Sequence, residues 1–113
     1  LHTPEVHLKL KNQTDMIMAR FEVEVDGYTP WHSHPGPVLI TVAEGQFKIT
    51  RYTKKDGCTE DVYGPGEGFI GPANVVHLGS NEGDTKVVGY VTFLNVPVGG
   101  LPLDDSHEAP ECG

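Results

Sequence analysis

The sequence lacks long apolar runs and is poor in positive charge. No stretch approaches the roughly 20 apolar residues that a membrane-spanning helix requires, so no membrane span is expected. Lys and Arg number 8 against 16 Asp and Glu, which gives a formal net charge of -8. Phosphate backbones repel a chain of this sign, so nucleic-acid binding is not expected. At 113 residues with 37% hydrophobic content, the chain is predicted to form one domain with a core of its own.

Cysteine is also scarce. Cys58 follows a turn-like Asp-Gly, and Cys112 lies one residue from the end of the chain. Their separation does not match the closely spaced cysteines of zinc sites, and counting alone leaves a disulfide and two free thiols as equal alternatives. The chain begins at Leu1 without a signal-like segment, so we expect that an upstream segment has been removed.

Glycine and proline, by contrast, are abundant, with 14 and 9 residues spread along the chain. Between them lie segments of alternating apolar and polar residues that are typical of strands. The predicted strands cover residues 6–10, 16–25, 38–42, 47–52, 68–70, 75–78 and 87–94. The turn sequences between them are too closely spaced for crossover helices, so we predict an all-β barrel or sandwich. From Pro97 onward, an irregular acidic tail is expected.

Three of the six histidines occur in an informative pattern. His32 and His34 are separated by one residue, so on an extended segment their imidazoles point to the same side. His77 lies in another apolar, strand-like segment. Three neutral imidazoles that converge can hold Fe, Mn, Co, Ni, Cu or Zn and leave further coordination positions open. The alternative from spacing alone is a surface pair of histidines and a separate core histidine.

Two segments resemble the two motifs of the cupin superfamily. In the first segment, residues 27–45, the family's His-x-His stands as WHSHPGPV, and Gly45 closes the motif at the expected distance. In the second segment, residues 66–81, the matching positions are Gly66, Pro72, His77 and Asn81. The resemblance implies a double-stranded β-helix, or jelly-roll barrel, over residues 1–96.

The match departs from the family at one chemically important position. Val38 stands where the first motif has a Glu ligand, and Leu39 follows it, so no carboxylate is available there. The resemblance therefore implies a three-histidine site, similar to those of thiol and diketone dioxygenases. Asn74 replaces a motif glycine, and asparagine tolerates the left-handed conformation that such a turn requires.

A narrower resemblance concerns the compartment. WHSHPGPVLITV, the cysteine after a turn, TFLNVPVGG and the cysteine near the end are similar to a group of small secreted bacterial cupins over nearly the whole chain. This resemblance implies a Cys58–Cys112 disulfide that tethers the tail, residues 97–113, and a secreted or periplasmic location. Cupins commonly pair through edge strands, so a homodimer is also implied.

The other side chains singled out are predicted to be structural. Asn81 is expected to cap a turn, because asparagine is a weak ligand for transition metals. Trp31 is assigned to the core or an interface, not to the pocket. Aromatic side chains expected in the core are Phe21, Phe69, Tyr90 and Phe93. Side chains expected in solvent are Arg20, Arg51, His2, His7 and His107.

Two functions follow from these features. One is a metalloenzyme in which His32, His34 and His77 hold a divalent transition metal and a small organic substrate undergoes a dioxygenase-type oxidation. The other is a secreted binding module that holds a metal or a small ligand without turnover. A barrel with a site does not name a reaction, so oxygen consumption is what separates the two.

Overall fold

A computed structural model describes residues 13–112 of the chain. Over these residues the chain forms strands and connecting loops without a helix, which confirms the all-β prediction. The strands are β1 (Asp15–Val23), β2 (Val38–Glu44), β3 (Phe47–Thr53), β4 (Gly57–Tyr63), β5 (Gly68–Gly71), β6 (Val76–Ser80) and β7 (Val87–Val96). In this part of the chain, accordingly, no helix is long and apolar enough to cross a bilayer.

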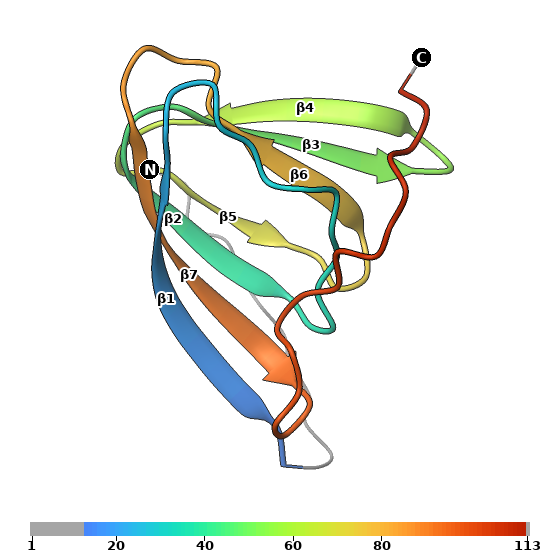
Figure 1. The fold of residues 1–113 in the computed structure, drawn as a ribbon. Coiled ribbons are helices and arrows are strands. Elements are labelled where there is room, and N and C mark those ends of the chain that lie inside the picture. Colours follow the sequence, from blue (N-terminus) through green and yellow to red (C-terminus); the bar gives the residue numbers. More distant parts are fainter. Residues whose placement is uncertain (1–12, 113) are drawn as a thin grey trace.

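The strands form two antiparallel sheets that face each other. One sheet has the order β1-β7-β2-β5, and the other has the order β4-β3-β6 (Figure 1). A short connection at Gly45 carries the chain from β2 in one sheet to β3 in the other, and a hairpin joins β3 to β4; Gly45 and Gly57 have the left-handed conformation at these two places. The inner faces enclose a core of Val23, Val42, Phe47, Ile49, Phe69 and Val87. The architecture is the one that the resemblance to cupins implies.

Six of the predicted strands agree with the structure, and one observed strand was missed. Residues 16–25, 38–42, 47–52, 68–70, 75–78 and 87–94 each match an observed strand within a few residues. Strand β4 was not predicted. It carries Glu60 and Asp61, lies at the edge of its sheet, and is largely exposed, so it has no apolar alternation to detect. The predicted strand at residues 6–10 lies outside the described residues.

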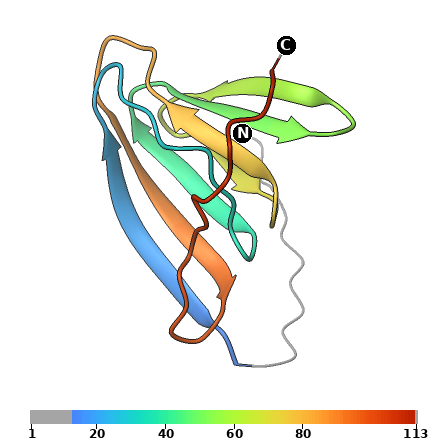
Figure 2. The same cartoon turned by 45° about the vertical axis from the view of Figure 1, so that its right-hand side comes forward.

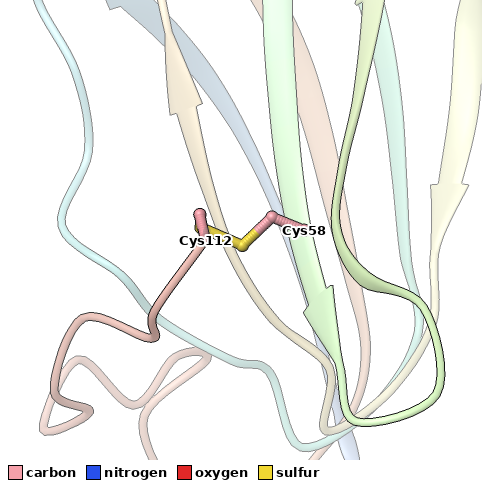
Figure 3. The surroundings of a disulfide bond; sticks show 2 residues. All are labelled: Cys58 and Cys112. Atoms are coloured by element: carbon pink, nitrogen blue, oxygen red, sulfur yellow. A yellow bond between two sulfur atoms is a disulfide. The ribbon is translucent and has the colours of Figure 1, made fainter.

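The segment after β7 crosses from one sheet to the other. It leaves the end of β7 and passes over the space between the sheets to the side of β3 and β4 (Figures 1 and 2). Asp104 forms an antiparallel bridge with Ser33, with backbone N–H···O distances of 2.8 and 2.9 Å. Cys112 is joined by a disulfide to Cys58 on β4, with Cα atoms 5.2 Å apart (Figure 3). The tail is irregular but attached at two places.

Candidate metal centre

The three histidines come from two segments that the backbone holds together. His32 and His34 lie in the connection between β1 and β2, and His77 lies on β6. His32 and His77 are paired as in an antiparallel sheet, with each N–H donating to the other's carbonyl at 2.9 Å. The chain around His32 is therefore extended, as predicted, but it pairs with β6 only through this short bridge. The pairing places the His32 and His77 side chains on the same inner face.

The imidazoles form a compact, buried cluster. One ring nitrogen from each histidine lies within 4.8 Å of the others, and no carboxylate or thiol of residues 13–112 joins this group. The exposed fractions are 9% for His32, 5% for His34 and 7% for His77. Polar groups buried to this extent require partners. The structure thus brings together the three histidines that spacing and resemblance singled out.

Backbone carbonyls fix which nitrogen of each ring faces inward. His32 Nδ1 contacts the Pro30 carbonyl at 2.7 Å, His34 Nδ1 the Pro102 carbonyl at 2.9 Å, and His77 Nδ1 the Val75 carbonyl at 2.9 Å. A carbonyl only accepts, so each Nδ1 carries the proton that it donates, and each neutral ring has an Nε2 lone pair. The Nε2 atoms of His34 and His77 are 3.3 Å apart.

This arrangement fits a metal ion. Two neutral Nε2 lone pairs cannot donate to each other, so their close approach is repulsive unless a cation lies between them. A ring nitrogen that donates to a carbonyl while the other faces the ion is the usual arrangement of metal-bound histidine. Three such nitrogens can serve as ligands for one divalent transition metal.

Burial keeps the imidazoles of His34 and His77 in the neutral form that ligation needs. Desolvation, against the opposing hydrogen bond to the Val75 carbonyl and with smaller contributions from the neighbouring imidazoles and Arg51, lowers the pKa of His77 to about 4. Desolvation also lowers the pKa of His34 below its ordinary value. Because neither ring is protonated at neutral pH, protons do not compete with a metal for these nitrogens there.

The same pKa values predict how the metal-free protein responds to acid. His77 has a pKa of about 4 when folded and about 6.5 when unfolded, so the unfolded chain binds more protons between these values. The contribution of His77 to the free energy of unfolding is therefore fully present above pH 6.5. It is lost as the pH drops towards 4, which lowers the free energy of unfolding by about 3 kcal/mol. Urea unfolding in the presence of a chelator checks this, and His77→Gln should flatten the curve between pH 4.5 and 6.5. An equal slope in both proteins would contradict the assignment.

The histidines open into a cavity of about 240 Å³ between the sheets. Its walls are mostly apolar side chains from both sheets, together with Leu103 of the tail. Val38, which stands at the family's glutamate position, is 1% exposed at the start of β2 and supplies no ligand. The carboxylates of Glu44 and Glu67 are also absent from the described cavity wall.

Asn81 and Asn74 have structural roles. The Asn81 side chain is fully buried, donates to the carbonyls of Val23 and Thr85, and accepts from Gly83 N–H, which confirms the predicted cap. Asn74 has φ 62°, the left-handed conformation expected where the family has glycine. Its N–H donates to the His34 carbonyl at 2.9 Å, so this turn helps to fix the histidine segment.

Three sequence-based assignments are wrong. Arg51 was expected in solvent, but its side chain is 21% exposed, lies opposite His77 in the sheet and forms an ion pair with Asp61. Tyr90 was expected in the core but is 52% exposed on the outer face. His107 was expected in solvent, yet it is half-buried, and its Nε2 contacts Ser33 Oγ at 2.8 Å. Arg20 is exposed as predicted, whereas His2 and His7 lie outside the described residues.

The contribution of the tail to this site was not predicted at all. Pro102 supplies the carbonyl that fixes His34, and Leu103 forms part of the cavity wall. A backbone carbonyl gives no side-chain signal in a sequence. The one available indication was Cys112, whose pairing brings the tail to the barrel.

Comparison with known proteins agrees with this geometry. The chain is 28% identical over 95 residues to the rhicadhesin receptor of Pisum sativum and 26% identical over 94 residues to germin-like protein 1 of Brassica napus. These alignments cover 77% and 82% of the chain but only 44% and 45% of the two relatives, so the chain spans less than half their length.

A solved structure of oxalate oxidase has a TM-score of 0.62 and 26% identity, and the match covers 68% of this chain and 40% of that one. The profile of the cupin domain family, Cupin_2, matches residues 19–93, about two thirds of the chain and the region that contains all three histidines. The chain belongs to the cupin domain family.

Proposed function

We propose that the chain holds one divalent transition metal ion on His32, His34 and His77 and acts as a dioxygenase-type oxidoreductase on a small organic substrate. The observation that carries this proposal is the convergence of three Nε2 atoms whose Nδ1 partners are all backbone carbonyls. The ions compatible with three imidazoles are Fe, Mn, Co, Ni, Cu and Zn. When bound, such an ion supplies Lewis-acid and redox chemistry at its open positions.

The protein itself orients the three imidazole rings and shapes the cavity beside them. The carbonyls of Pro30, Val75 and Pro102 hold the rings in one tautomer and orientation, and apolar side chains surround the space beside the histidines. The described wall contains no carboxylate, lysine or arginine to act as a general acid or base. This composition favours chemistry at the ion over hydrolysis, which needs a positioned proton acceptor.

Metal loading followed by oxygen uptake tests the proposal. After anaerobic reconstitution with Fe(II), elemental analysis is expected to find about one ion per chain. The loaded protein is then expected to consume oxygen with at least one member of a panel of small organic substrates. Stoichiometric metal without oxygen uptake would support the alternative, a non-catalytic binding module. Absence of metal under all conditions would remove the metal-dependent oxidoreductase and leave only a module that binds a small ligand without metal.

The setting of the protein is part of the proposal. We place the chain outside the cytoplasm, secreted or periplasmic, because structural disulfides such as Cys58–Cys112 persist in oxidising compartments. Residues 1–96 would form the barrel and 97–113 the tethered tail.

A homodimer is also part of the proposal. It would form through the edge strand β1, whose Met16 and Met18 side chains are exposed, and light scattering would then give a mass of twice 12.3 kDa.

A further inference from the structure

The composition of the cavity wall restricts what can bind beside the histidines. Apart from these rings, the wall consists of aliphatic and aromatic groups and one hydroxyl, that of Thr29. The apolar members come from both sheets and from the tail, among them Phe21, Ile40, Phe47, Val91, Phe93 and Leu103. The Thr29 hydroxyl donates its only proton to the Pro30 carbonyl and accepts from Gly79 N–H, so it has no proton left to donate to a ligand. The other polar side-chain atoms of the wall are the three imidazole Nε2 atoms, which carry no proton in this tautomer.

The wall also offers no cation for a second negative charge. Arg51 is the long cation nearest in register, directly opposite His77 on the inner face of β3. Its guanidinium is engaged elsewhere, 3.4 Å from a carboxylate oxygen of Asp61 and 5.6 Å from the centre of the Phe69 ring. Burying unpaired negative charge is strongly unfavourable, and a dianion bound to the ion, even as a chelate, would leave its outer carboxylate oxygens facing a wall without a cation or a free side-chain donor.

We infer that the cavity takes a small, largely apolar molecule that presents a single anionic or lone-pair donor group to the metal, and that it discriminates against oxalate-like dianions. This inference rests on the proposed function for the position of the donor group. Three neutral ligands leave a divalent ion with its full charge, which one anionic group partly neutralises. The apolar remainder of the ligand would lie against Ile40, Val91 and Phe93.

The size of the cavity agrees with a ring-sized ligand. A dry apolar cavity of about 150 Å³ accommodates benzene, and this one has about 240 Å³. A six-membered ring with a short polar head therefore fits. Oxalate oxidase, a relative by structure, acts on a small dianion according to its name, so the proposed ligand class separates this chain from that relative.

Two ligands with the same metal-binding head provide the test. Co(II) is loaded into the protein, and its visible absorption is followed during titration with acetohydroxamate, benzohydroxamate and oxalate. Burying the phenyl ring is expected to make benzohydroxamate bind roughly 10- to 100-fold more tightly than acetohydroxamate. Oxalate is expected to bind more weakly than benzohydroxamate. Equal affinity for the two hydroxamates, or tightest binding of oxalate, would overturn the inference.

A pair of matched variants locates the preference in the cavity. Ile40→Ala removes part of the wall, whereas Ile70→Ala makes the same change on the neighbouring strand β5, where Ile70 points to the outer face. The preference for benzohydroxamate is expected to fall about fivefold in the first variant, because three methyl or methylene groups are lost, and to stay unchanged in the second. Equal effects would show that the preference does not arise at this wall.

A measurement without metal separates the two proposals. Toluene is titrated into the metal-free protein, and backbone amide signals are followed by NMR. Shifts at Ile40, Val91 and Phe93 would support an apolar binding cavity even if Co(II) failed to bind and the proposed metal function were lost. Stoichiometric Co(II) with no toluene shifts and no hydroxamate preference would instead keep the metal function and remove this inference.

Discussion

Replacing His77 by alanine is expected to lower the affinity for a divalent transition metal by more than about 100-fold. Loss of an outer hydrogen-bond partner of a ligand already costs roughly 10- to 100-fold, and this change removes a ligand itself. The remaining pair, His32 and His34, leaves an ion with two protein nitrogens in an apolar cavity. Titration with Co(II) in the presence of a competing chelator measures the difference.

His107 provides a matched control, because it is a histidine that lies outside the cluster. His107→Ala removes a half-buried imidazole that contacts Ser33, not the three Nε2 atoms, and should leave metal affinity nearly unchanged. Circular dichroism would show whether both variants keep the strand signal of the parent. Stoichiometric metal retained by a folded His77→Ala protein would refute the ligand assignment.

A strand can be predicted from the sequence when one of its faces is buried, because its apolar and polar residues then alternate. Strand β3 alternates buried Phe47 and Ile49 with more exposed residues, and this alternation is visible in the sequence. Strand β4 is held by its backbone pairing to β3 and by the disulfide at Cys58, neither of which requires an apolar pattern. Arg51 shows a related limit, because the face that a residue occupies depends on register, and a period of two does not determine register.

The site was predictable where it depends on side chains and not where it depends on the backbone. His32, His34 and His77 have a recognisable spacing, and Val38 is visible in the sequence as a missing carboxylate. The groups that orient the rings are carbonyls, and every residue carries one. Pro102 accepts from a histidine 68 positions away, a contact that follows from the path of the tail.

Removing the disulfide by Cys58→Ser with Cys112→Ser is expected to lower the free energy of unfolding by about 4 kcal/mol. The bridge closes a loop between residues 54 positions apart, and the chain-entropy account assigns about this amount to a loop of that length. Urea denaturation of the oxidised parent and the double variant measures the change. Serine is nearly isosteric with cysteine, so the variant mainly reports the lost cross-link. A difference below about 1 kcal/mol would contradict this account.

The tail is expected to matter for the metal as well as for stability, and a truncated chain separates the two effects. A chain that carries Cys58→Ser and ends at Gly100 lacks the same cross-link as the double variant but also lacks Pro102 and Leu103. His34 Nδ1 then loses its carbonyl partner, and the cavity loses part of its wall. Metal affinity is therefore expected to fall about 10-fold below that of the double variant, as for other outer partners of ligating histidines. Equal affinity in the two proteins would mean that the tail stabilises the barrel without orienting His34.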